Sequence, residues 1–238
     1  MLDPPFEMGS HMLKRACLSI VVVALGVGGC TGKEQRRTAV ATAPVVPSTG
    51  SAGASACTRD DSDQGIPRTA PRQVFWKRFE GVAVPFSSSV GPLDVRGDIA
   101  RCYAHTARGA LFAAVQISVR LDRSTRWRKI MEKQVVQGVG KQAFARVRAA
   151  GQRVPAGRAS QIMGFRVVSY TPETAVVGTV SRDPVRGGYT ARTTTVKWES
   201  DWKLAPTSAG STGSVPQDVD SLSGYVFWGG FGPPRERS

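Results

Sequence analysis

Apolar residues between positions 106 and 150 recur every three or four residues, which is the spacing of helices. The pattern predicts a first helix after Thr106, a residue type that favours helix N-termini. It predicts a second helix at about residues 125–137 and a shorter third one at about residues 141–150, each followed by glycine. The apolar positions of the first helix are Ala110, Ala113, Ala114, Ile117 and Leu121.

Beyond residue 160 the apolar period falls to two, which is the spacing of strands. Residues 165–180 predict a hairpin that turns at Thr171-Pro172-Glu173-Thr174. Strands are also predicted at residues 189–198 and 202–204, and residues 222–231 supply a last apolar edge segment. We therefore expect an α+β domain at residues 74–232, with three N-terminal helices packed on one face of a curved antiparallel sheet.

The strongest apolar run lies near the start of the chain and predicts an export signal. Lys14 and Arg15 precede about a dozen apolar residues, and two glycines precede Cys30. The run is shorter than the roughly 20 residues of a transmembrane helix. Val27-Gly28-Gly29-Cys30 resembles the lipobox of bacterial lipoproteins, which implies a signal peptide at residues 12–29 and lipidation of Cys30. An ordinary signal peptide or a buried strand remains the alternative.

Three segments carry no periodic pattern. Residues 1–11 are typical of a cloning tag or of a start codon placed too early. Residues 30–73 are rich in Ala, Thr, Pro, Ser and Gly and cannot bury enough apolar surface to fold, so we expect a flexible, disordered tether. Residues 233–238 form a polar tail.

Short motifs in the predicted domain resemble two known groups of proteins. They are Gly91-Pro92, residues 104–110, the Trp198-Glu199-Ser200-Asp201-Trp202 motif and Ser223-Gly224-Tyr225. The three helices followed by hairpins resemble the cone-shaped fold of the nuclear-transport-factor and cystatin-like superfamily. The motifs resemble a family of uncharacterised actinobacterial proteins that often belong to mobile elements. This resemblance implies a part like that of the cone-shaped assembly factors of conjugation and type IV secretion machines.

Four cysteines occur, and the export signal accounts for two of them. Cys17 lies in the leader and Cys30 is the proposed lipid site, which leaves Cys57 and Cys102. Because an exported protein meets oxidising conditions, we expect these two to form a disulfide. The alternative is two separate thiols.

The chain carries a net charge of +14, and residues 120–158 hold eleven Lys or Arg against two acids. This excess predicts a surface for anionic lipid headgroups, wall polymers or nucleic acid, and charge alone does not choose among them. The alternative is an ordinary solvated helical face. The residues of this basic helical surface are Arg126, Arg128, Lys129, Lys133, Lys141, Arg146 and Arg148.

Candidate catalytic residues are few. His105 is the only histidine after the leader, and its place before a helix cap favours a backbone hydrogen bond over catalysis. Asp201 lies in a tight turn, where carboxylates usually have a structural role. The motifs of serine hydrolases, phosphate loops, zinc proteases and dinucleotide sites do not occur, and we expect no metal and no cofactor.

Four tryptophans favour a packed core over a ligand pocket. They are Trp76, Trp198, Trp202 and Trp228. We therefore predict a lipid-anchored protein on the extracytoplasmic face of the cell membrane that binds or scaffolds envelope partners without catalysis, in conjugation or another mobile-element function. A prophage-type exclusion lipoprotein is one alternative. A small-molecule isomerase or hydrolase is another, and a deep pocket with a pKa-shifted carboxylate or His105 would favour it.

Overall fold

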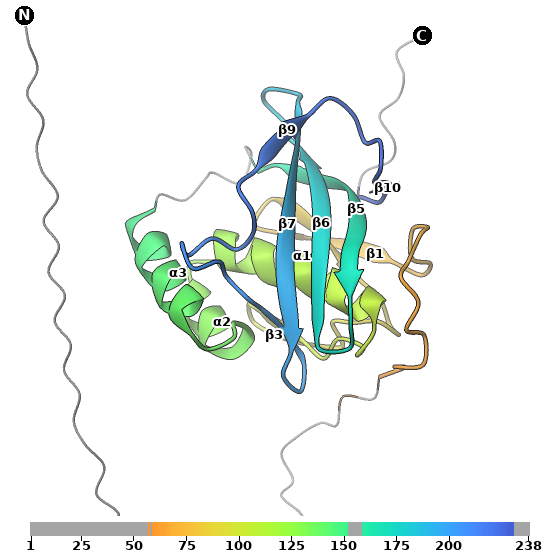
Figure 1. Cartoon of the computed structure of the whole chain (residues 1–238), viewed down its shortest axis with the longest axis horizontal. Helices are drawn as coiled ribbons and strands as arrows, with labels where there is room; N and C mark the ends of the chain where they lie inside the picture. The colour runs from red at the N-terminus through yellow and green to blue at the C-terminus, as the bar shows by residue number, and fades with distance from the viewer. Residues whose placement is uncertain (1–56, 58, 152–158, 231–238) are drawn as a thin grey trace, which may run out of the picture. The chain divides into compact units, whose positions relative to one another are not determined.

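A computed structural model of the chain describes residues 57, 59–151 and 159–230 (Figure 1). Contacts divide the chain into two units, residues 1–52 and 53–238, and every described residue belongs to the second unit. The predicted signal peptide, Cys30 and the tail at residues 233–238 lie outside the described residues. No helix in the described part is long and apolar enough to cross a membrane.

The domain begins with four short strands, so the prediction that helices come first is wrong. The strands form two antiparallel hairpins, β1 (Phe75–Phe79) with β2 (Val82–Phe86) and β3 (Asp94–Arg96) with β4 (Ile99–Arg101). Glu80 and Gly81 both have positive φ, at 48° and 87°, which gives a two-residue turn whose twist matches that of paired strands. Pro85 reads as a strand breaker in the sequence, but the two-stranded ladder accommodates it at its edge.

Helix α1 (Ala107–Arg123) is the central element of the domain, as Figure 1 shows. Its predicted cap is confirmed, because the Thr106 hydroxyl accepts a hydrogen bond from the Gly109 amide at 3.1 Å. Strands of the main sheet cover one side of the helix, and the β1–β2 hairpin covers another. Thirteen of its 17 residues are buried, which is far more than one apolar stripe would require.

Two shorter helices follow, α2 (Trp127–Gln134) and α3 (Val139–Ala150). Helix α2 ends earlier than predicted because Val135 is extended and forms a bridge with Leu204. Helix α3 begins after Gly138, whose φ of 137° breaks the helical path. Gly140 lies so close to the chain after residue 204 that an added Cβ would be 2.4 Å from the Pro206 carbonyl oxygen. A glycine there lets α3 pack tightly on this segment.

The main sheet is antiparallel, with the strand order β10-β5-β6-β7-β8 and β9 paired with β7. The predicted strand at residues 189–198 is confirmed at both ends, and the predicted hairpin is confirmed with longer arms. The last apolar segment contributes only the two-residue strand β10. The strands are β5 (Gln161–Tyr170), β6 (Thr174–Arg182), β7 (Tyr189–Trp198), β8 (Trp202–Leu204), β9 (Gln217–Val219) and β10 (Val226–Phe227). The fold is therefore mixed α+β, with three helices and an antiparallel sheet.

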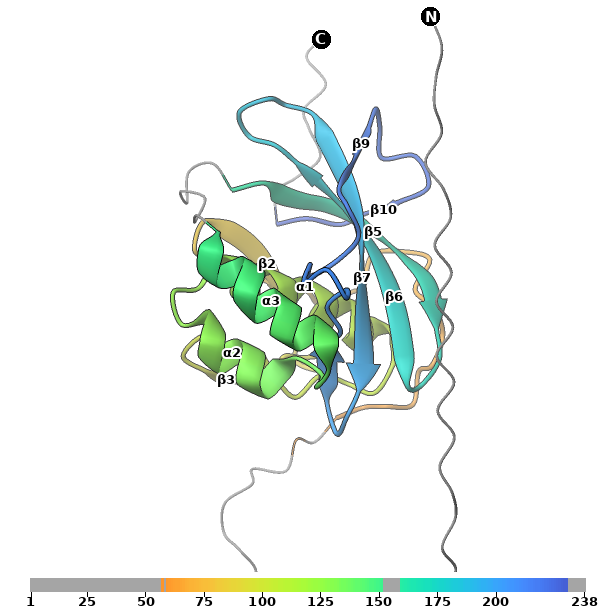
Figure 2. The same cartoon turned by 60° about the vertical axis from the view of Figure 1, so that its left-hand side comes forward.

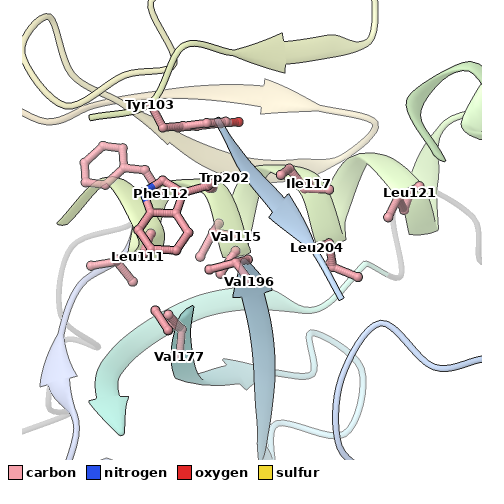
Figure 3. Packing of buried hydrophobic residues seen from close by; sticks show 14 of the residues in the cluster. Tyr103, Leu111, Phe112, Val115, Ile117, Leu121, Val177, Val196, Trp202 and Leu204 are labelled. Atoms are coloured by element: carbon pink, nitrogen blue, oxygen red, sulfur yellow. The ribbon is translucent and has the colours of Figure 1, made fainter. Parts of the chain in front are cut away.

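The hydrophobic core lies between α1 and the sheet. Figure 3 shows Tyr103, Phe112 and Trp202 at one end of this core, where all three side chains are buried. Trp228 is also buried, whereas Trp76 and Trp198 are partly buried and pack against the same cluster. The tryptophans fill or flank the core, as the sequence indicates.

A strap formed by Cys57 and residues 59–66 lies against the domain, although the sequence assigns it to the tether. Cys57 forms the predicted disulfide with Cys102, with their Cα atoms 5.5 Å apart. The Asp61 carboxylate accepts a hydrogen bond from the His105 amide at 2.5 Å, and Asp63 pairs with Arg108 at 2.6 Å. These polar contacts fix a segment that has little apolar surface of its own.

Candidate functional site

A cavity of about 700 Å³ opens between the C-terminal half of α1, helix α3 and strands β5 to β7. Figure 2 shows α3 and these strands, which supply opposite parts of its wall together with the loop at residues 209–212. The volume is within the usual range of about 300–1,000 Å³ for small-molecule sites. None of the four tryptophans lines it, and neither does His105.

The sheet forms a polar wall because its inner face changes character along the strands. Successive partners on this face of β6 and β7 are Ala175 with Val196, then Val177 with Thr194, then Thr179 with Arg192. Ala175, Val177 and Val196 are fully buried in the core, whereas Thr179, Thr194 and Arg192 line the cavity. On this face of each strand, residues two or four positions apart therefore belong to the apolar core and to the polar cavity wall.

Helix α1 makes the same change on its own surface. Ala114, Ser118 and Asp122 are spaced four residues apart, so they lie on one face, and all three line the cavity. Ile117 and Leu121 lie on the neighbouring face and are fully buried. The last two turns of α1 therefore present both a core surface and a polar surface to the inside of the domain.

Asp122 is the acidic centre of the cavity. Its carboxylate oxygen is 3.8 Å from Nη1 of Arg192. Burial raises the pKa of Asp122, although the charges of Arg192 and Arg148 and a hydrogen bond with Thr212 act to lower it. Its side chain still retains 40% of its accessible surface, in keeping with its place on the cavity wall. A carboxylate in this setting can accept a hydrogen bond from a ligand or exchange a proton with it.

Two arginines beside Asp122 are held by the protein itself. Arg192 donates from Nη2 to the Thr212 hydroxyl at 2.8 Å, and its Nε is buried with no partner among the described residues. Arg148 donates to the carbonyl oxygens of Leu121 and Asp122 at 3.1 and 3.0 Å. Because carbonyls at a helix C-terminus lack intrahelical partners, Arg148 caps α1 and carries its positive charge to the cavity rim.

Three hydroxyl groups on the sheet wall form no hydrogen bond within the described part of the chain: those of Thr179, Ser181 and Thr194. Thr194 is nevertheless a buried residue, with 3% of its surface exposed. Hydroxyl groups enclosed in a protein usually have a partner. These three are therefore available to a molecule that enters the cavity.

Most side chains of the basic helical surface already have partners within the protein. Arg148 caps α1, and Lys141 donates to the carbonyls of Glu132 and Val135 at the end of α2. Arg126 pairs with Asp98 and Lys133 with Glu132, while Arg128 lies over the Trp127 ring at 4.4 Å. Among the seven side chains, those of Lys129 and Arg146 form no ion pair, hydrogen bond or ring contact within the described residues.

His105 and Asp201 serve the other end of the domain, away from the cavity lining. The His105 ring stacks on Trp198 with their centroids 3.8 Å apart, and its Nε2 lies 2.6 Å from the Pro172 carbonyl. Asp201 accepts hydrogen bonds from the amides of Cys102 and Tyr103 at 2.7 and 3.1 Å. Burial raises the pKa of Asp201, which these bonds oppose. Both residues therefore connect segments that are distant in sequence, and neither lines the cavity.

Of the polar residues that line the cavity, the sequence pattern singles out Arg148 alone, as part of the basic helical surface. Asp122 is one of the two acids in the basic stretch at residues 120–158, and Thr179 and Thr194 fall within predicted strands. The available signal was the spacing of Ser118 and Asp122, which places both polar residues on one helical face. No group of three or more His, Cys, Asp or Glu side chains that could hold a metal ion is found in the described part of the chain.

Comparison with protein-family models gives one match, to a domain of unknown function, DUF8175, over residues 37–227. The chain belongs to this family. Searches of curated proteins and of solved structures gave no significant match. The matched range spans every described helix and strand, so the cavity lies wholly within the DUF8175 domain. The family match carries no statement of activity.

Proposed function

We propose that this DUF8175 protein is an exported, lipid-anchored binding protein that holds a small amphipathic molecule in the cavity beside α1. The observation that carries the proposal is a cavity of about 700 Å³ with the Asp122–Arg192 pair and three unpartnered hydroxyls on one side. The remaining wall is largely apolar, including Val115, Val119 and Phe144.

The choice of threonine over an apolar residue on the cavity wall supports a role in ligand binding. The hydroxyls of Thr179 and Thr194 form no hydrogen bond among the described residues, and valine at either position would fill similar space and add apolar contacts instead. A protein that used this region only for stability would gain by such replacements. Sites that bind ligands commonly give up stability in this way.

Export to an oxidising compartment is supported by the disulfide between Cys57 and Cys102. The basic leader, its short apolar run and the lipobox-like residues ending at Cys30 support lipidation and a place on the extracytoplasmic face of the cell membrane. The cone-like resemblance supports, as context, a conjugation or mobile-element complex in the envelope, with prophage-type exclusion as the alternative. Lys129 and Arg146 are the residues we propose for contact with an anionic surface, whether lipid, wall polymer or nucleic acid.

A catalytic use is a second candidate, and the raised pKa of Asp122 in a cavity favours it. An isomerase or hydrolase would use Asp122 to move a proton. Asp122 would be essential for turnover in that case, and Asp122→Asn would abolish turnover while retaining most of the affinity for ligand. We favour binding because the Asp122 carboxylate is already engaged with Arg192 and Thr212.

The cavity proposal is tested by filling the cavity. Thr179→Phe places a ring against the polar wall, and Val168→Phe is its control because Val168 is 52% exposed and lies outside the cavity lining. We expect the uncharged fluorescent amphiphile N-phenylnaphthylamine to bind the wild type and Val168→Phe equally, and Thr179→Phe at least about tenfold more weakly. Equal binding by all three folded proteins would contradict the proposal.

The anchor is tested separately by intact mass and cell fractionation in an actinobacterial host. We expect the wild type to start at Cys30, to carry added acyl mass and to pellet with membranes, and Cys30→Ala to lose all three properties. A soluble protein cleaved elsewhere and unaffected by Cys30→Ala would contradict lipidation. That outcome would leave the cavity proposal in place.

A further inference from the structure

The unused hydrogen-bonding groups of the cavity indicate which chemistry its ligand has. Thr179, Ser181 and Thr194 each offer a hydroxyl that can both donate and accept. The ionised Asp122 carboxylate can only accept hydrogen bonds, and the Arg192 guanidinium can only donate them. Asp122 Oδ2 and Arg192 Nη1 lie 3.8 Å apart. A ligand that contacts this wall therefore needs a hydrogen-bond donor and a hydrogen-bond acceptor on neighbouring atoms. Hydroxyl groups on adjacent carbons meet this need, because one can donate to Asp122 while the next accepts from Arg192.

The charges around the cavity argue against a strongly ionic ligand. Arg123, Arg148 and Arg192 face Asp122 and Asp183 across it, so the lining carries a balance of only one positive charge. A carboxylate that approached Arg192 would also meet the Asp122 carboxylate. A cation that approached Asp122 would meet the arginines. An uncharged ligand avoids both repulsions.

The rest of the lining favours a molecule with an apolar part. Val115 and Val119 of α1, Phe144 and Val147 of α3, and Ile162 of β5 line the cavity. They provide a surface for the C–H face of a sugar ring and for a hydrocarbon chain attached to it. A lining with both polar and apolar side chains matches a ligand that has a polar and an apolar part.

We propose that the cavity binds an uncharged, hydroxyl-rich sugar ring that carries an apolar substituent, the chemistry of a glycolipid headgroup. The inference rests on the proposed function and names its ligand class. Thr194 and Asp122 are the residues that distinguish a sugar from other amphiphiles, because they contact the ligand only through hydrogen bonds.

The test compares four probes of similar size by calorimetry, each below its micelle concentration. They are octyl β-glucoside, methyl β-glucoside, sodium octanoate and octyltrimethylammonium bromide. We expect octyl β-glucoside to bind the wild type at least about tenfold more tightly than either charged octyl probe. Methyl β-glucoside separates a free sugar from a glycolipid, and the apolar wall predicts that it binds more weakly than the octyl compound.

Matched variants locate the recognition. Thr194→Val and Asp122→Asn keep the side-chain shape, and each should weaken octyl β-glucoside about tenfold or more. Thr194→Val should leave octanoate unchanged, and Asp122→Asn should not weaken octanoate, because it removes the carboxylate that repels an anion. Thr195→Val is the control because Thr195 follows Thr194 on the other face of β7 and is absent from the cavity lining. It should leave all affinities unchanged.

The possible outcomes distinguish the sugar ligand class from the more general proposal that the cavity binds a small amphipathic molecule. Equal binding of all three octyl probes, or binding of octyl β-glucoside that is indifferent to Thr194→Val and Asp122→Asn, would overturn the sugar class and leave a binding cavity. Failure of octyl β-glucoside to bind, with N-phenylnaphthylamine still bound in the cavity, would do the same. Failure of every probe, including N-phenylnaphthylamine, would overturn both.

Discussion

The two ends of the interface between α1 and the sheet are built from the same elements and have opposite properties. At one end Leu111, Val177 and Val196 belong to the core cluster and have no exposed surface. At the other end Ser118 and Arg192 line a cavity. The ladder between β6 and β7 continues from one end to the other without a register shift. Along these two strands the difference lies in the side chains, and helix α3 completes the cavity wall.

This difference separates the residues that stabilise the fold from those that we expect to act. Buried apolar side chains at the sealed end contribute by burial and dense packing. The hydroxyls on the cavity wall add little to stability, because they form no hydrogen bond among the described residues and face an open cavity. Substitutions at the two ends should therefore affect different measurements.

The largest expected difference is between two adjacent residues of α1. Ile117→Ala removes a fully buried side chain and should lower the free energy of unfolding by about 2–5 kcal/mol. Ser118→Ala removes a hydroxyl that bonds only to the Ala114 carbonyl and should change it by less than about 0.5 kcal/mol. Urea unfolding followed by circular dichroism measures both. Equal losses would mean that the cavity end is packed as tightly as the core.

Loss of the disulfide should weaken the fold without affecting the cavity. Cys57 and Cys102 close a loop of 45 residues at the sealed end of the domain, where the strap contacts His105 and Arg108. Cys57→Ser with Cys102→Ser should therefore lower the free energy of unfolding by about 2–4 kcal/mol. Binding of N-phenylnaphthylamine should be unchanged at a temperature where the variant remains folded. A parallel loss of binding would show that the two ends are coupled.

Thr194→Val should not lower the free energy of unfolding, unlike the two preceding substitutions. It replaces a hydroxyl that has no partner among the described residues by a methyl group of similar size, so the free energy of unfolding should stay constant or rise by up to about 1 kcal/mol. Thermal unfolding measures this change, and Thr195→Val on the other face provides the control. A loss of more than about 1 kcal/mol would show that the Thr194 hydroxyl has a structural partner.

The smallest effect concerns pH and Asp122. Because burial raises the pKa of this carboxyl in the folded state, its charge opposes folding at neutral pH, and that penalty is relieved as pH falls through the raised pKa toward the ordinary aspartate pKa of 3.8. Asp122→Asn should therefore be slightly more stable than the wild type at pH 7, and the difference should shrink toward pH 4. Unfolding measured at both pH values checks this. A variant that is less stable at pH 7 would show that the pair with Arg192 is net stabilising.

The sequence predicted the sealed end far better than the cavity end. Thr106 marked the start of α1 correctly, and the alternation at residues 189–198 gave β7 with both ends right. These features follow from local periods and caps. The β1–β2 hairpin was missed because Glu80 and Gly81 are not a common hairpin turn pair and Pro85 interrupts the strand pattern.

The cavity was missed for a different reason. A polar residue on a helix or strand normally faces solvent, and nothing local distinguishes Asp122 or Thr194 from such residues. Only the register of β6 with β7 and the position of α3 place them on an inner wall. The strap was missed similarly, since its contacts with His105 and Arg108 join residues more than 40 positions apart.

The most direct test of the central claim, that the polar end of the α1–sheet interface is a ligand site, is a nuclear magnetic resonance titration. Backbone amide shifts of the ¹⁵N-labelled domain would be followed while octyl β-glucoside is added below its micelle concentration. The account predicts saturable shifts at Ser118, Asp122, Thr179 and Thr194, with Ile117 and Val177 little changed. Shifts confined to exposed residues such as Val168, or no saturable shift at all, would contradict it.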